Sequence, residues 1–123
     1  MKKSKNIKQT DEEKIKSQKK VAFKYPGKEE KKDGILKDRA IVYKSMSGKI
    51  PYWDIVDLIE FKGEKWMRIG YYRKKKVLRF ASQTTITEPI SIWKDIFVNA
   101  AKEKEWFRKL LKEVIAEQPK WDK

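Results

Sequence analysis

The chain has 123 residues, 32 Lys and Arg against 18 Asp and Glu, and a formal net charge of +14. It contains no cysteine and no histidine, which excludes disulfides, thiol nucleophiles, imidazole-based catalytic triads and the ordinary zinc site. Carboxylate chemistry with Mg²⁺, chemistry of Lys or Tyr, and binding without catalysis stay open. We expect no cofactor.

The length is that of one domain. No run of 18 apolar residues is present that could cross a membrane, and the start, Met-Lys-Lys-Ser-Lys-Asn, lacks the apolar stretch of a secretory signal. We therefore expect a cytoplasmic protein with no membrane contact. The positive charge favours polyanionic partners, nucleic acid first. The competing interpretation is a solubility surface or adaptation to heat, since Lys outnumbers Arg by 27 to 5.

Residues 1–33 form a separate compositional block with 12 Lys and 6 acids, a net charge of +6. Low hydrophobicity with high charge predicts a disordered basic arm. Two local elements stay open inside it: a short helix around 11–20, with acids in its first turn, and an edge strand over 21–25. Most of the hydrophobic residues lie in 34–123, which we expect to form a single α+β domain.

The first strand predicted in this domain is 39–44, followed by a turn at Ser47-Gly48-Lys49. The segment 52–61 fits two structures. As a helix it has Asp54, Asp57 and Glu60 on a solvated face. We favour a strand, because the β-rich segment that follows needs a partner within turn distance.

Two further strands, 66–72 and 77–84, flank a basic turn at 73–76. Side chains alternate between the two faces of a strand. In the first strand this alternation places on one face Trp66, Arg68 and Tyr72. In the second it separates Leu78 and Phe80 from Arg79 and Gln83. We expect Arg79 to share the face of Tyr72, in an antiparallel meander of three to four strands.

Two C-terminal helices are expected after the sheet. Thr87 is the predicted N-cap of the first, with Glu88 in its first turn. Two apolar stripes follow, made of Trp93, Phe97, Ala100 and Ala101 and then of Phe107, Leu110, Leu111, Val114 and Ile115. We expect a break between the helices at 102–105, with one bent helix as the alternative.

The main functional signal is a gap in acidity. The 23 residues between Glu64 and Glu88 contain seven bases and no acid. In such a segment the aromatic side chains can stack on nucleobases, and the neighbouring Lys and Arg side chains can bind phosphates. We expect a non-catalytic accessory protein that binds DNA or RNA through Lys65, Trp66, Arg68, Tyr72, Arg73, Lys74, Lys75, Lys76, Arg79 and Gln83. The alternative is that Trp66 and Tyr72 pack under the helices while the bases surround a solvated turn.

Two other functions stay open. One is a protein-interaction module or subunit of a larger complex that contacts its partner through Trp106 and Trp121. The other is a Mg²⁺-dependent nuclease, because Glu60-Phe61-Lys62 matches a Glu-x-Lys pattern in which a further acid shares the metal. Asp38 or Asp54 would supply that acid. A Glu-x-Lys match arises by chance in a Lys/Glu-rich chain, so we do not expect an enzyme or a metal site.

Overall fold

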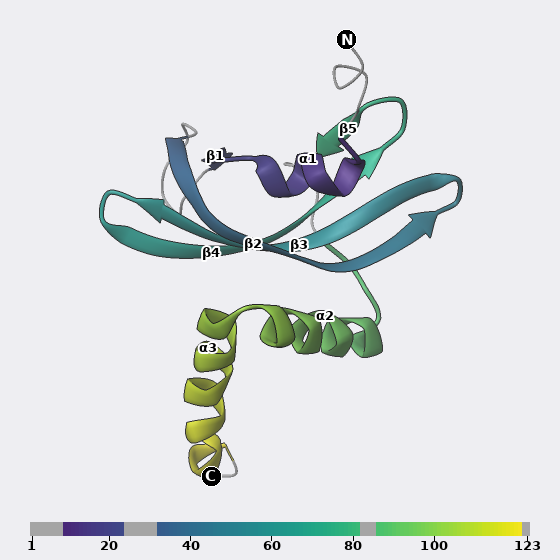
Figure 1. Ribbon diagram of the computed structural model, residues 1–123. Helices are drawn as coiled ribbons and strands as arrows, with labels where there is room; N and C mark the ends of the chain where they lie inside the picture. Colours follow the sequence, from purple (N-terminus) through teal and green to yellow (C-terminus); the bar gives the residue numbers. More distant parts are fainter. Residues whose placement is uncertain (1–8, 24–31, 82–85, 122–123) are drawn as a thin grey trace.

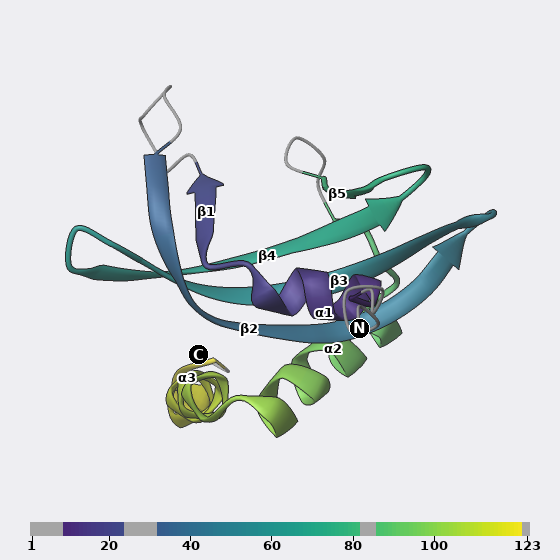
Figure 2. The same cartoon turned by 45° about the horizontal axis from the view of Figure 1, so that its top comes forward.

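The computed structural model describes residues 9–23, 32–81 and 86–121. Within these ranges the strands form one five-stranded antiparallel sheet in chain order. The sheet is curled, with α1 on its inner face and α2 on its outer face (Figures 1 and 2). The strands are β1 (Lys20–Phe23), β2 (Lys32–Ser47), β3 (Ile50–Phe61), β4 (Glu64–Lys74) and β5 (Leu78–Phe80). The helices are α1 (Asp11–Ser17), α2 (Ile90–Glu103), α3 (Glu105–Ala116) and a 3₁₀ turn (Gln118–Lys120).

The predicted α+β class is confirmed, and the described sheet has more strands than the three to four expected. The segment 52–61 is a strand, as favoured, and forms most of β3. Its hairpin with β4 closes through Lys62 and Gly63, which both have positive φ (52° and 79°). A two-residue turn of this kind matches the twist of the strands that it joins, so it sets the register of the pair.

The N-terminal block contributes structured elements to the domain. Thr10 caps α1: its hydroxyl accepts from the Glu13 N–H at 3.1 Å, and the Glu13 carboxylate accepts from the Thr10 N–H at 2.9 Å. Ile15 of α1 is fully buried, and β1 pairs with β2 through Val21 and its neighbours. The expected boundary after residue 33 falls inside β2. The described parts of 1–33 therefore belong to the sheet and its inner layer, rather than to a disordered arm.

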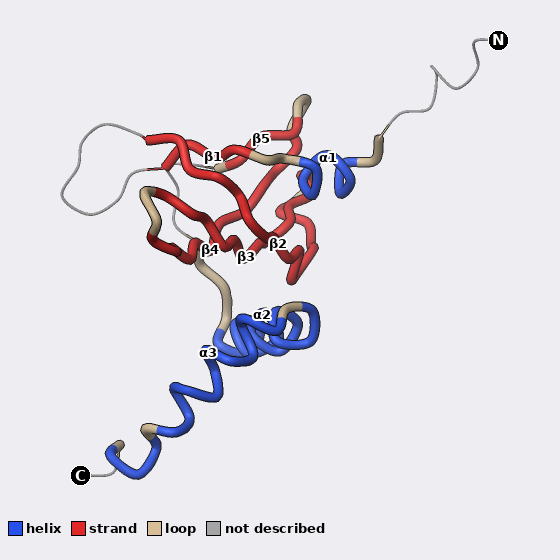
Figure 3. The backbone as a smooth tube through the Cα atoms, turned by 60° about the vertical axis from the view of Figure 1, so that its left-hand side comes forward, coloured by secondary structure: helices blue, strands red, loops and turns tan. Residues whose placement is uncertain are grey.

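The C-terminal helices separate at Lys104, whose backbone is extended (φ −125°, ψ 121°), so the predicted break is confirmed. The predicted start is wrong, because Pro89 takes the N-cap position and α2 begins at Ile90. Thr87 therefore does not cap the helix, and Glu88 lies before it. The axis of α3 points away from the sheet (Figures 1 and 3). Phe107 at its start is buried, whereas side chains near its end are largely exposed.

The curled sheet has a core on each face. The inner core lies under α1 and consists of Ile15, Trp53, Ile55 and Tyr72, with Ile41, Leu78 and Phe80 packed around them. The outer core lies against α2 and α3 and consists of Ala40, Val42, Val56, Ile96, Ala100 and Phe107. Strand β3 supplies side chains to both cores, so residues 53–57 are all buried. This explains why its sequence lacks the polar alternation of a half-exposed strand.

A buried ion network crosses the inner face. Asp57 is fully buried and accepts from Arg39 at 2.6 Å (Nε) and 2.9 Å (Nη2). It also accepts from Nη2 of Arg68 at 2.9 Å. One carboxylate thus faces two guanidinium groups. A buried charge is tolerated only when it is paired and its hydrogen-bonding groups are satisfied.

The remaining donors of Arg39 bind α1 and its C-terminal flank. Its Nη1 donates to the Ile15 carbonyl at 2.8 Å, to the Gln18 side chain at 3.0 Å and to the Tyr72 hydroxyl at 2.9 Å. The Tyr72 hydroxyl in turn donates to Gln18. The network therefore holds α1 on the sheet through directional contacts in addition to the burial of Ile15.

We expect Asp57→Ala to lower the free energy of unfolding by about 3–5 kcal/mol, because it leaves the buried Arg39 and the partly buried Arg68 without a counter-charge. Glu60→Ala is the matched control on the same strand. Its partner Lys37 lies 3.4 Å away in an exposed pair, and such pairs contribute about 0–1 kcal/mol. Urea denaturation of both variants measures the difference. Equal destabilisation by the two substitutions would contradict a central role for the network.

We also expect Gly70→Ala to be destabilising, because an added Cβ would lie 2.6 Å from Cζ of Phe80. Overpacking of this kind typically costs about 1–3 kcal/mol. The double-mutant cycle with Phe80→Ala, followed by urea denaturation, tests the cause. The cost of Gly70→Ala should fall to a few tenths of a kcal/mol once the ring is removed; an unchanged cost would place the strain elsewhere.

Candidate functional site

Three of the predicted contact residues lie on the inner face of the sheet, in the core. Arg68 binds Asp57, and its guanidinium lies 4.3 Å from the ring centre of Phe80. Tyr72 is buried at 8% exposure, and Trp66 packs beside Val21 and Ile59. These side chains do not form an open stacking surface. The alternative was right that Trp66 and Tyr72 are packed, but wrong that the C-terminal helices cover them: Tyr72 packs with Ile15 of α1, and Trp66 packs with Val21 of β1.

The predicted position of Arg79 is wrong. Tyr72 pairs with Phe80, and Arg73 pairs with Arg79, so Arg79 lies on the face opposite to Tyr72. Of the strand predicted over 77–84, the described part is β5 at Leu78–Phe80; its side chains alternate as predicted, but its register against β4 was wrong. The cause is the length of the turn, since the register of a hairpin follows from its turn and not from the strand pattern alone.

The other predicted bases divide into two groups. Four exposed cations gather where β4 and β5 meet: Arg73, Lys75, Lys76 and Arg79. We call these four residues the basic hairpin. Lys74 points to the inner side and binds Asp11 at 3.1 Å. Lys65 is exposed at the far end of β4, opposite Glu60. Gln83 lies outside the described residues.

An aromatic cluster that the sequence interpretation missed lies beside the basic hairpin on the outer face. The ring centres of Tyr43 and Tyr52 are 6.3 Å apart, and those of Tyr52 and Tyr71 are also 6.3 Å apart. Tyr71 precedes Arg73 by two residues and therefore shares its face. The two-residue spacing could therefore have predicted that Tyr71 lies beside Arg73. Tyr52 could not be assigned to the cluster from the sequence, because its neighbours depend on the pairing of β3 with β4.

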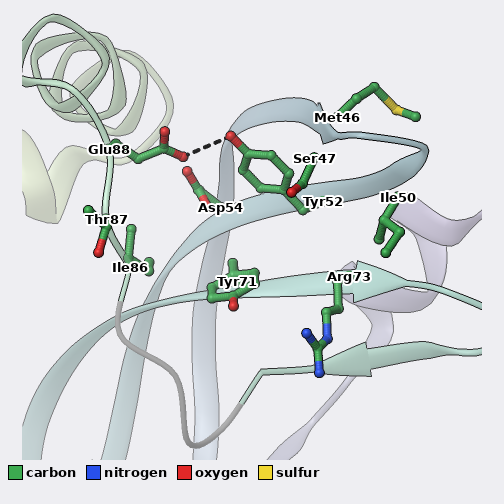
Figure 4. Close-up of a pocket in the computed structure, with 10 residues that line it drawn as sticks. All are labelled: Met46, Ser47, Ile50, Tyr52, Asp54, Tyr71, Arg73, Ile86, Thr87 and Glu88. Carbon is green, nitrogen blue, oxygen red and sulfur yellow. Dashed lines mark hydrogen bonds between the residues drawn. The ribbon is translucent and has the colours of Figure 1, made fainter.

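A cavity of about 340 Å³ opens between this aromatic cluster and the segment that precedes α2 (Figure 4). Tyr52 and Asp54 reach it from β3, Tyr71 and Arg73 from β4, and Glu88 from the segment before α2. The other lining residues are Met46, Ser47, Ile50, Ile86 and Thr87. The walls are therefore partly apolar and partly aromatic, with acidic groups at one side and a guanidinium group at the other.

The two carboxyl groups of the cavity interact strongly. Asp54 is 1% exposed, and its Oδ2 accepts no hydrogen bond from any described residue. Burial, together with the adjacent Glu88 carboxylate, raises the pKa of Asp54 to about 8. The Tyr52 hydroxyl donates to Glu88 Oε2 at 3.1 Å, and burial with this hydrogen bond raises the pKa of Tyr52 to about 12. At neutral pH Asp54 is thus mainly protonated.

The residues of the nuclease hypothesis do not meet in the structure. Asp38 accepts from Lys104 at 2.6 Å and from the Trp106 indole at 3.0 Å. Glu60 pairs with Lys37, and Lys62 lies in the turn after β3. Among the described residues, no three His, Cys, Asp or Glu side chains are grouped so that they could hold a metal ion.

The two tryptophans proposed to contact a protein partner differ in their surroundings. Trp106 is partly buried through its hydrogen bond to Asp38 and its ring contact with Phe107, 5.8 Å between centres. Trp121 is 53% exposed. The described geometry therefore leaves a largely exposed indole only at Trp121 of this pair.

Comparisons with protein-family models, with curated proteins and with solved structures found no match. No helix in 9–23, 32–81 or 86–121 is long and apolar enough to cross a membrane.

The raised pKa of Asp54 predicts a stability that falls with pH. Between its unfolded value near 4 and its folded value of about 8, the native state binds a proton that the unfolded state lacks, so unfolding becomes easier as pH rises. We expect a loss of about 3 kcal/mol in unfolding free energy from pH 5.5 to 8.5.

Urea denaturation across this pH range, applied to Asp54→Asn, tests the assignment. The variant should lose most of the pH dependence and should be more stable than the parent at pH 8.5. Asp95→Asn, at an exposed position of α2, is the matched control and should keep the dependence. If Asp54→Asn keeps the parent's dependence of unfolding free energy on pH, another group is responsible for it.

Proposed function

We propose that this protein binds nucleic acid without catalysis, through the basic hairpin on the outer side of its sheet. One observation carries the proposal: Arg73 and Arg79 face each other across β4 and β5, both exposed, and the turn between the strands adds Lys75 and Lys76. Four cations thus lie close together within a stretch of sequence that has no acid. Such a cluster attracts a phosphate backbone.

The neighbouring tyrosines support a single-stranded ligand in preference to a duplex. Tyr71 lies on the same face as Arg73, next to the ring of Tyr52. Aromatic side chains bind nucleobases by stacking only when those bases are unstacked from their neighbours, as in single strands, loops and bulges. Stacking and phosphate contacts would then occur on adjacent parts of the same surface.

The inner face is excluded from this role by its own contacts. Arg68 and Tyr72 take part in the network around Asp57 beneath α1. Opening that face to a ligand would require α1 to leave and Arg39 to lose its bond to the Ile15 carbonyl. The outer face needs no such rearrangement, which favours it as the binding surface.

Neutralising the basic hairpin should weaken binding and reduce its dependence on salt. We expect replacement of all four residues by Gln to make the slope of log K against log salt less steep by about 3, since each phosphate contact to a single strand contributes about 0.7. Fluorescence anisotropy with labelled 12-nucleotide oligo(U) and oligo(dT), between 50 and 300 mM salt, measures both quantities.

A control with the same loss of charge separates local contacts from the overall field. Lys94, Lys102, Lys109 and Lys112 are four exposed lysines on α2 and α3, and their replacement by Gln should change the slope by less than 1. Equal effects of the two quadruple variants, or no binding by the parent protein at 50 mM salt, would refute the proposal.

A further inference from the structure

We propose that the cavity beside the basic hairpin is a recognition site for an unpaired guanine base. The inference rests on the proposed function and deepens it, because the base would belong to the strand that the hairpin holds. The site consists of the Tyr71 ring and the Glu88 carboxylate, with Asp54 beside Glu88 and Arg73 at the edge (Figure 4).

The size and walls of the cavity suit a flat aromatic ligand. Its volume is about 340 Å³, at the lower end of the range for small-molecule pockets. Tyr52 and Tyr71 supply aromatic surface, with their rings 6.3 Å apart and nearly perpendicular. The side chains of Met46, Ile50 and Ile86 supply apolar contact. A base can therefore stack on one ring while its edge reaches the polar side of the cavity.

The polar side of the cavity contains more hydrogen-bond acceptors than donors. Glu88 already accepts from the Tyr52 hydroxyl, but a carboxylate has about four acceptor positions. Asp54 is mainly protonated at neutral pH and lies next to Glu88, so it supplies a hydroxyl donor there in place of a second free acceptor. A ligand that donates N–H groups would bind the remaining acceptor positions of Glu88.

Among the common bases, guanine fits this requirement best. Its Watson–Crick edge carries N–H donors on two adjacent nitrogens, N1 and N2, which can bind both oxygens of one carboxylate. Adenine and cytosine donate from a single exocyclic nitrogen on that edge, and uracil donates from one ring nitrogen. A charge-assisted, two-point contact of this kind is stronger and more selective than a single hydrogen bond.

The sign of the charge at the rim favours a nucleotide over an organic cation. Arg73 lines the cavity and is exposed, and Arg79 lies directly opposite it across β4 and β5. A cationic ligand would be drawn to Glu88 but repelled by these two guanidinium groups. A nucleotide places its base at the carboxylates and its phosphate at the arginines, so both interactions are favourable.

Two titrations test the site, and they separate the free nucleotide from the strand. In the first, ¹H–¹⁵N NMR spectra are recorded with GMP, AMP, CMP or UMP at pH 6.5. We expect GMP to bind at least tenfold more tightly than the others and to shift amides near residues 52–54, 71–73 and 86–88. In the second, 12-nucleotide oligo(U) with one central G is compared with the same strand carrying A, and the G strand should bind about tenfold more tightly.

Variants show whether Glu88 reads the base. Glu88→Gln keeps an acceptor for Tyr52 but offers one N–H₂ in place of the second oxygen, so the preference for G over A should fall to within about twofold. Tyr71→Leu should weaken binding of every nucleotide about tenfold, through loss of stacking. Glu117→Gln, at an exposed carboxylate paired with Lys120, is the matched control and should retain the G preference.

The outcomes distinguish this inference from the proposed function. Salt-dependent binding of oligo(U) with equal affinity for the G and A strands would overturn the guanine site and leave the basic hairpin in place. Binding of GMP without binding of any strand would support the cavity and refute the strand-binding function. If the four nucleotides bind with equal affinity and spermidine displaces them, the cavity is a cation site. That result would also overturn the inference.

Discussion

The fold depends on the contact between one buried carboxylate, Asp57, and two guanidinium groups. Asp57 lies on β3, which supplies fully buried side chains to both cores, while Arg39 and Arg68 come from the strands on either side of it. Arg39 then needs the carbonyl group of Ile15 in α1. Because a buried cation requires every donor to be matched, the position of α1 follows from this pairing. The inner face is consequently committed to structure, and this is why the proposed binding surface is the outer face.

The outer face combines features that the sequence separates. Tyr52 and Asp54 precede Tyr71 and Arg73 by almost twenty residues, and Glu88 follows after another fifteen. Antiparallel pairing of β3 with β4 and the path of the chain before α2 bring all five to one cavity. The cavity thus combines the positive charge of Arg73, the rings of Tyr52 and Tyr71, and the acceptor oxygens of Glu88. That arrangement suits a ligand with a phosphate, a flat ring and N–H donors.

Much of the fold could be predicted from alternation and turn residues. The pattern in 66–72 correctly set Trp66, Arg68 and Tyr72 apart from Tyr71, yet it could not show which face was covered, because both faces carry aromatic and basic side chains. The short helix that the sequence left open around 11–20 is present at 11–17, and Thr10 and Glu13 have the spacing of a capping box that would have favoured it. Glu88 was assigned to a first helical turn, whereas Pro89 starts the helix later and leaves Glu88 beside Tyr52. The presence of Glu88 in the site therefore depended on where α2 begins.

The burial of β3 on both faces also affects how the molecule unfolds. Its residues 53–57 alternate between a core that includes the N-terminal α1 and a core that includes the C-terminal α2. Loss of either helical layer would expose one side of this strand and loosen the backbone that the other layer packs on. The two ends of the described chain are therefore coupled through the middle of the sheet, and probes placed on α1 and on α2 should report one cooperative transition with a common midpoint.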